Sequence, residues 1–219
     1  MMKMLQHRNC RRLLVLMALA AALSACSIGG SPRQSATLYS PDVRIQAAAD
    51  WPTVSWQLMI VKPVAARMVD SPRIAVRPVP GELQVYRGAS WAQPATDLVE
   101  ATILRAMEDS GRIPAVARSG TGIRADYKLV MDLRRFESDY VGGTTPAATI
   151  ELAAKLLDSK DQRVVAAHTF RQVEPAAGTE IGPVVTAFER ALQALTTELV
   201  AWTLRNGEAA HLQTARERP

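Results

Sequence analysis

The centre of the chain reads ADYKLVMDLRRFESD (residues 125–139), and this stretch decides the fold. Apolar side chains recur there at every second position, at Tyr127, Leu129, Met131 and Leu133, while most of the positions between them are charged. Because successive side chains of a β-strand point to opposite faces of the sheet, this spacing predicts a strand with one buried face and one polar face.

Two further alternating runs follow the central stretch. The apolar or aromatic positions on one side of these runs are Ile150, Leu152, Ala154 and Leu156, and then Val164, Ala166, His168 and Phe170. A segment that contains Gly and Pro, residues 142–146, separates the first run from the second. Polar residues 158–161 separate the second run from the third. Three long strands joined by short turns predict an antiparallel meander, a sheet that can leave one face exposed to water.

Shorter strands are predicted upstream, at residues 56–61, 73–77 and 83–86, with a Pro-Val-Pro-Gly turn at residues 78–81. A first helix is predicted from Asp97 to Ser110. Asp97 can cap it, Glu100 completes a pattern like a capping box, and Gly111 supplies the stop.

The last predicted element is a helix from about Pro183 to Arg205, ending at Asn206-Gly207. Its apolar residues form one stripe: Val185, Phe188, Leu192, Leu195, Leu199 and Trp202. The stripe could pair with a second helix, but it covers fewer than three heptads, so packing against the sheet is the favoured interpretation. Together these elements predict an α+β fold, an antiparallel sheet with a long central meander packed by two amphipathic helices.

The N-terminal residues have the pattern of an export signal. Four basic residues precede an apolar run at residues 13–23, which is too short for a transmembrane helix. Leu23-Ser24-Ala25-Cys26 is similar to the lipobox of bacterial lipoproteins, which implies cleavage before Cys26 and lipidation of its thiol. The alternative is an ordinary secretory signal with a chance cysteine at its end.

The expected organisation is therefore a signal peptide (1–25), a lipidated cysteine with a flexible tether (26–37), one α+β domain (38–206) and a disordered polar tail (207–219). Lipoproteins retained in the inner membrane often carry Asp after the lipidated cysteine. Ser27 stands there in this chain, which favours the periplasmic face of the outer membrane over the inner membrane.

Charge argues against a nucleic-acid partner. The net charge of the whole chain is +5, from 26 basic and 21 acidic residues. Four of the basic residues lie in the predicted signal, which leaves a net charge of +1 after cleavage. Cys10 would be removed with the signal and Cys26 lipidated, so the mature domain is expected to contain no disulfide.

No pattern in the sequence predicts a catalytic, metal or cofactor site. His168 and His211 have neither metal-ligand spacing nor a nucleophile motif beside them. Asp126 and Asp132 would lie about 20 Å apart on one strand, too far apart for paired acid–base work. Glu137 and Asp139 share a face at a strand end, where they are expected to be solvated. We therefore predict that the chain is not an enzyme.

The most unusual local cluster is Tyr86, Trp91 and Pro94, in a segment expected to be a loop between strand and helix. Aromatic residues in such a loop could form a packing cluster or contact a partner. Packing is the more common outcome, and both interpretations stay open.

The chain resembles the auxiliary lipoproteins of ABC-type transport systems, the family that includes the paraquat-inducible lipoprotein. Five features carry the resemblance, and they occur in family order. They are the lipobox at Cys26; Leu38-Tyr39-Ser40-Pro41; residues 71–76 leading to residues 83–86 and Trp91-Ala92-Gln93-Pro94; residues 125–129 with Phe136-Glu137; and residues 198–202. Ser90 departs from the family, which usually has Arg at that position, so no role is carried over to it.

The resemblance implies an α+β domain and a non-catalytic part in moving lipids, phospholipid or sterol-like, across the cell envelope. It also implies partners: an ABC permease and ATPase, and a periplasmic Mce-domain protein of the same system. The alternative function is that of a structural envelope lipoprotein that braces or assembles another outer-membrane component. The sequence leaves homo-oligomer formation open.

Overall fold

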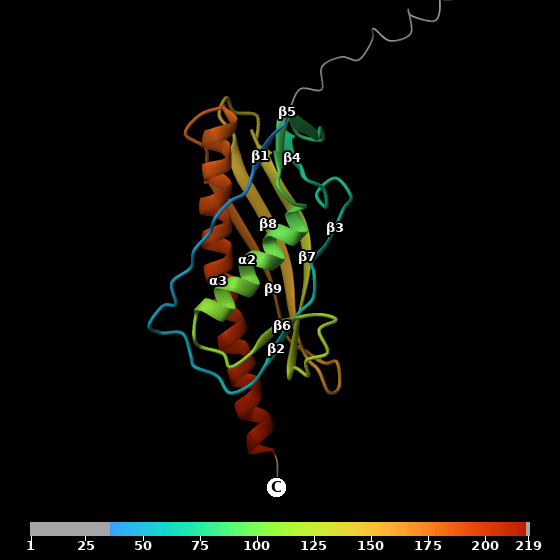
Figure 1. The fold of residues 1–219 in the computed structure, drawn as a ribbon, viewed down its shortest axis with the longest axis vertical. Coiled ribbons are helices and arrows are strands. Elements are labelled where there is room, and N and C mark those ends of the chain that lie inside the picture. Colours follow the sequence, from blue (N-terminus) through green and yellow to red (C-terminus); the bar gives the residue numbers. More distant parts are fainter. Residues whose placement is uncertain (1–35, 218–219) are drawn as a thin grey trace, which may run out of the picture. The chain divides into compact units, whose positions relative to one another are not determined.

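The computed structural model describes residues 36–217. The predicted signal peptide, Cys26 and most of the tether lie outside the described residues. The described chain folds into one mixed sheet and two helices (Figure 1). The elements, in chain order, are β1 (Thr37–Tyr39), β2 (Leu58–Ile60), β3 (Val64–Ala65), β4 (Arg73–Arg77), β5 (Gln84–Trp91), α2 (Ala95–Asp109), β6 (Val116–Arg118), β7 (Tyr127–Asp139), β8 (Ala147–Asp158), β9 (Val164–Pro175) and α3 (Ile181–Arg216).

The predicted meander is confirmed. β7 pairs antiparallel with β8, and β8 pairs antiparallel with β9, so that Leu152 lies opposite both Leu133 and Phe170. These three side chains are at most 1% exposed. They belong to the sheet face that α3 covers, whereas the other face of the meander carries mostly exposed or half-buried residues and, among residues 36–217, is covered by no helix (Figure 1).

The upstream strands add a feature that the alternating pattern does not predict. β2, β3 and β4 all lie parallel to β7, along the edge of β7 that β8 leaves free. β5 pairs antiparallel with β4, while β1 lies parallel to β5 and β6 parallel to β2. The sheet is thus mostly antiparallel, with short parallel strands on the far side of β7.

A bulge in β7 changes which residues face the core. The pairing with β8 shifts between Leu133 and Arg135, so the alternation that begins at Tyr127 does not continue in phase. After the bulge, Phe136 and Ser138 occupy the face that α3 covers, and both are buried. The bulge lets β7 keep one buried face over its whole length, although its sequence alternation breaks.

The first helix starts earlier than predicted. α2 begins at Ala95 with Pro94 at the N-cap position, and no side chain caps it, so the predicted Asp97 cap is wrong. Asp97 lies instead in the first turn and forms an ion pair of 2.6 Å with Lys62. The predicted stop is confirmed, because Gly111 has φ = 61° directly after the C-cap residue.

The second helix is longer than predicted. The predicted stripe packs against the sheet, since its residues from Val185 to Leu199 are buried and only Trp202 is half-buried. However, α3 does not end at Asn206-Gly207 but continues to Arg216, so the expectation of a disordered tail after residue 206 is wrong.

Gly207 explains why the helix passes a residue that commonly ends helices. A Cβ atom placed on Gly207 would lie 2.4 Å from Cζ2 of Trp56, whose indole is fully buried. The indole Nε1 donates a hydrogen bond of 3.2 Å to Oε2 of Glu208, the next residue of the helix. Gly207 therefore allows α3 to pass close over Trp56, and this packing offsets its low helix propensity.

Candidate functional site

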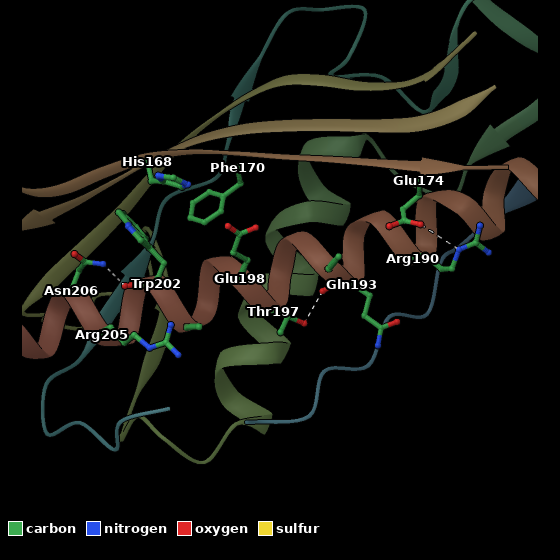
Figure 2. A pocket seen from close by; sticks show the side chains of 12 residues that line it. His168, Phe170, Glu174, Arg190, Gln193, Thr197, Glu198, Trp202, Arg205 and Asn206 are labelled. Carbon is green, nitrogen blue, oxygen red and sulfur yellow. Dashed lines mark hydrogen bonds and ion pairs between the residues drawn. The ribbon is translucent and has the colours of Figure 1, made fainter. Parts of the chain in front are cut away.

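A groove of about 780 Å³ runs between strand β9 and helix α3. Figure 2 shows its lining, in which His168 and Phe170 of β9 point toward the helix, Trp202 and Glu198 of α3 point back, and Gln193 and Arg205 point away from the strand. We call it the β9–α3 groove. Its lining residues are His168, Phe170, Glu174, Arg190, Gln193, Ala194, Thr197, Glu198, Ala201, Trp202, Arg205 and Asn206.

Three rings form the apolar part of the groove. Phe170 packs edge-to-face on Trp202, with ring centroids 5.6 Å apart, and His168 lies 4.6 Å from Phe170. Phe170 is buried, whereas Trp202 is half-buried and His168 is exposed. His168 lies two residues before Phe170 on the same face of β9. The helix covers His168 less completely than it covers Phe170. The alternation of the sequence places His168 and Phe170 on one face, and the helical stripe provides Trp202.

Polar groups around the rings satisfy one another. Arg190 forms an ion pair of 3.7 Å with Glu174 and donates a hydrogen bond of 2.9 Å to the carbonyl of Pro175. Glu198 accepts a hydrogen bond of 3.0 Å from Gln172. Arg205 is paired with Asp50, outside the groove. Both arginines of the groove have a carboxylate partner, whereas Glu198 is bonded only to the neutral amide of Gln172, so the groove favours an apolar or uncharged polar ligand over an anion.

The strand beside the groove has an unoccupied edge. Within residues 36–217, β9 pairs only with β8, so the backbone groups along its other edge have no ladder partner. Such an edge can accept an added strand through main-chain hydrogen bonds. The groove and this edge adjoin, which gives one surface both an apolar floor and a row of backbone donors and acceptors.

Trp91, the central residue of the predicted aromatic cluster, lies in the core and not on a surface of this kind. Residues 84–91 form strand β5 rather than a loop, and Trp91 is only 1% exposed. Its ring packs edge-to-face on Phe136 and Phe188, at 5.7 and 5.1 Å. For Trp91 the packing interpretation therefore describes the structure, and contact with a partner would require the core to open.

Tyr86 and Pro94 lie apart from that core position. The hydroxyl of Tyr86 is 3.0 Å from Oγ of Ser138, and burial raises the pKa of this tyrosine above its ordinary value. Pro94 is half-buried at the start of α2. Tyr86 thus lies at a strand contact and Pro94 at a helix start, and because both keep part of their surface exposed, their contact with a partner stays a prediction.

The pair Glu137 and Asp139 contradicts the expectation of solvated carboxylates. Glu137 is 2% exposed and Asp139 8% exposed. Glu137 accepts two hydrogen bonds of 3.0 Å from the guanidinium of Arg77, and Arg135 binds both carboxylates. The hydrogen bonds to Glu137 raise the pKa of Arg77 further above its ordinary value. The sequence could not indicate this cluster, because only the pairing of β4 with β7 brings Arg77 beside Asp139.

In the part of the chain that the structure describes, no group of three or more His, Cys, Asp or Glu residues could hold a metal ion. Asp126 accepts a hydrogen bond of 2.9 Å from the backbone of Gln57, and Asp132 is exposed beside Arg134. Among residues 36–217, no helix is both long and apolar enough to cross a membrane.

Comparison with known proteins gives a consistent family assignment. The family described as "ABC-type transport auxiliary lipoprotein component" matches residues 37–200. The uncharacterized protein bll6063 of Bradyrhizobium diazoefficiens is 31% identical over 186 residues, which cover 84% of this chain. This chain spans only about half of that protein's length, 49%.

Solved structures agree with the sequence match. A crystal structure of protein XCC0632 from Xanthomonas campestris, of family DUF330, is 60% identical, covers 81% of this chain and 99% of its own, and superposes with a TM-score of 0.79. A crystal structure of another uncharacterized protein, 10% identical, covers 76% of this chain and 97% of its own, with a TM-score of 0.59. The second similarity shows the fold alone.

Proposed function

This chain belongs to the family of ABC-type transport auxiliary lipoproteins, and on that basis we propose that it is a non-catalytic subunit of an ABC/Mce-type lipid transport system. In this proposal Cys26 carries the lipid anchor in the outer membrane and the domain works in the periplasm. The partners are a Mce-domain periplasmic protein and the ABC permease and ATPase of the same system. The observation that carries the proposal is the family match, which extends over residues 37–200 and so over nearly all of the described domain.

The β9–α3 groove is the described surface best suited to contact the partner. Trp202 presents part of its ring there, beside an exposed His168 and an unoccupied strand edge. Tryptophan is among the residues that contribute most to binding when a partner covers it. The ion pairs of Arg190 and Arg205 would remain in place after a partner segment covers the groove.

The proposal can be tested with the double substitution Trp202→Ala and His168→Ala in the full chain, co-expressed with the Mce-domain protein of its system. We expect at least tenfold lower recovery of the Mce-domain protein on the tagged double variant. Because Trp202 is half-buried, the loss of stability should be about 1–2 kcal/mol, less than the 3–5 kcal/mol typical of a buried tryptophan. A thermal melt of the same preparation checks that the variant is folded.

Leu212→Ala is the matched control, since Leu212 is exposed on the same helix but does not line the groove. This variant should recover the Mce-domain protein as the wild type does. Full recovery on the folded double variant would refute the assignment of the groove.

A genetic comparison tests the function itself. Deletion of this gene should reproduce the lipid-transport defect of deleting the ATPase gene, for example a more permeable outer membrane. Normal permeability and lipid traffic in the deletion strain, with both lost in the ATPase strain, would refute the transport proposal and favour a structural brace.

A further inference from the structure

A second pocket, of about 740 Å³, lies at the opposite end of the sheet from β1, β4 and β5. Strand β2, the first residues of β7, the loop after β6 and the turn between β8 and β9 form its walls. In Figure 1 that loop and that turn meet at the same end of the sheet. We call it the basic pocket, because Arg124, Lys128 and Lys160 all line it.

The three cations come from different elements, and the fold holds those elements together. Lys128 lies in β7, in register with Met59 of β2, whose side chain is another part of the lining. The backbone N–H of Ser159 donates a hydrogen bond of 2.8 Å to the carbonyl of Asp126, which ties the turn carrying Lys160 to the start of β7. The pocket is therefore a product of the sheet topology and not of a run of basic residues.

Its positive charge is not neutralised within the described chain. Among residues 36–217, none of the three cations takes part in an ion pair, and Lys128 has only a 3.5 Å contact with the amide oxygen of Gln162. The single acid in the lining, Asp126, accepts a hydrogen bond from the backbone N–H of Gln57. The arginines of the β9–α3 groove, by contrast, each have a carboxylate partner. The lining thus carries three positive charges and one negative charge, and the carboxylate of Asp126 is already hydrogen-bonded to the backbone. This excess of positive charge attracts an anion.

The remaining lining fits an anion with an apolar neighbour. Met59 and Ile123 supply apolar surface, and Ile123 is 43% exposed. Ser159 adds a hydroxyl whose oxygen is buried and has no hydrogen-bond partner among the described residues. A buried hydroxyl without a partner is destabilising, and rotation toward the pocket would let it donate to an oxygen of a bound anion.

We propose that the basic pocket binds a phosphate group, held by Arg124, Lys128 and Lys160. Lysine and arginine are the side chains that bind phosphate oxygens best, and arginine can do so through two parallel hydrogen bonds. The phosphate can belong to the headgroup of a phospholipid or be free in solution. The phospholipid source rests on the proposed transport function, whereas phosphate binding itself does not.

The test uses the full chain in a neutral detergent and two probes. Inorganic phosphate is titrated by calorimetry, and dioleoyl phosphatidylglycerol is compared with dioleoyl phosphatidylcholine by native mass spectrometry. The triple variant Arg124→Gln, Lys128→Gln and Lys160→Gln should lose at least tenfold in affinity for every probe that the wild type binds. The control Lys155→Gln with Arg171→Gln removes two exposed cations of the same sheet face outside the pocket and should bind as the wild type does.

The two probes separate the sources of phosphate. Phosphatidylglycerol binding with weak or no binding of inorganic phosphate supports a lipid headgroup, and Ile123→Ser should then weaken it. Equal molar affinity for both probes, with no effect of Ile123→Ser, supports free phosphate. The proposal is overturned if the wild type binds neither probe, or if the triple variant binds both as well as the wild type does. Because these are measurements on the isolated protein, they can fail while the genetic test of transport succeeds, and the reverse.

Discussion

The substitution Gly207→Ala should destabilise the protein, although it replaces a poor helix former with the best one. In an exposed helix this change would contribute about 1 kcal/mol of stability. Here the new Cβ atom would lie 2.4 Å from Cζ2 and 2.8 Å from Cη2 of Trp56. Apolar carbon atoms pack at about 3.5–4.0 Å, so the helix and the buried indole would have to separate by about 1 Å or more.

The magnitude follows from three contributions. Overpacking a core position costs about 1–3 kcal/mol. Separation of the helix from Trp56 also weakens the hydrogen bond from its Nε1 to Glu208, which contributes about 0.5–1.5 kcal/mol. After the gain of about 1 kcal/mol in helix propensity, the net loss in the free energy of unfolding should be roughly 1–3 kcal/mol.

Gly182→Ala is the matched control, because the same change in the same helix meets nothing within 4 Å. It should leave stability unchanged or raise it by roughly 0.5 kcal/mol. Urea unfolding of a chain that begins at residue 36, followed by tryptophan fluorescence, measures both variants. A Gly207→Ala protein as stable as the wild type would refute the reasoning and show that α3 can bend away from Trp56 at little cost.

Three further predictions concern other parts of the chain. Glu137→Gln should lower the free energy of unfolding by about 2 kcal/mol. This loss is smaller than for a fully buried ion pair, because the Arg77 and Arg135 side chains are 26% and 24% exposed. The control Asp132→Asn removes an exposed carboxylate from the same strand and should change the free energy of unfolding by less than about 0.5 kcal/mol. Burial raises the pKa of Tyr127 to about 12, so the unfolded chain loses this proton first above its ordinary pKa of 10. Stability should therefore fall between about pH 10 and 12 more steeply in the wild type than in Tyr127→Phe, and equal slopes in urea melts would contradict this. Cys26→Ser should abolish lipidation, and mass spectrometry of the wild type should find acyl chains on residue 26; an unmodified thiol there would disprove the anchor.

Most of the fold could be predicted from residue periodicity. Alternation located β7 as far as Leu133, β8, and the inward face of β9 from Ala166 to Phe170, and the 3–4 spacing of apolar residues located α3. Val164 was wrongly predicted on that face, because a register shift places it opposite Leu157, and it is 48% exposed. These signals are strong because the elements are long and one side of each is buried. The parallel pairing of β2, β3 and β4 with β7 was not predicted, since strands of two to five residues carry too few side chains to specify their neighbours. The end of α3 was mispredicted because the partner of Gly207, Trp56, lies about 150 residues earlier in the chain.

The candidate site was less accessible to sequence reasoning. Tyr86 and Trp91 drew attention as a local aromatic cluster, but Trp91 points into the core once residues 84–91 form a strand. The groove was missed because it combines His168 and Phe170 with Trp202, which belongs to another element. A signal did exist in the sequence: an apolar face on the last strand of a meander, followed by a helix whose final stripe residue is a large aromatic.

The position of β7 also determines the order in which the chain can fold. Its hairpin with β8 is local, whereas its parallel partners pair across long separations, Leu58 with Tyr127 and Ala75 with Glu137. Local contacts form sooner than distant ones, so the transition state should contain the β7–β8 hairpin and little of β2 or β4, with higher φ-values in the hairpin. In a chain that emerges with its N-terminus first, β2, β3 and β4 therefore lack their β7 partner until residue 139 has followed, although β4 can already pair with β5. During that interval β2 and β4 remain open to chaperones and to other chains, and aggregation is a greater hazard before β7 appears than after it.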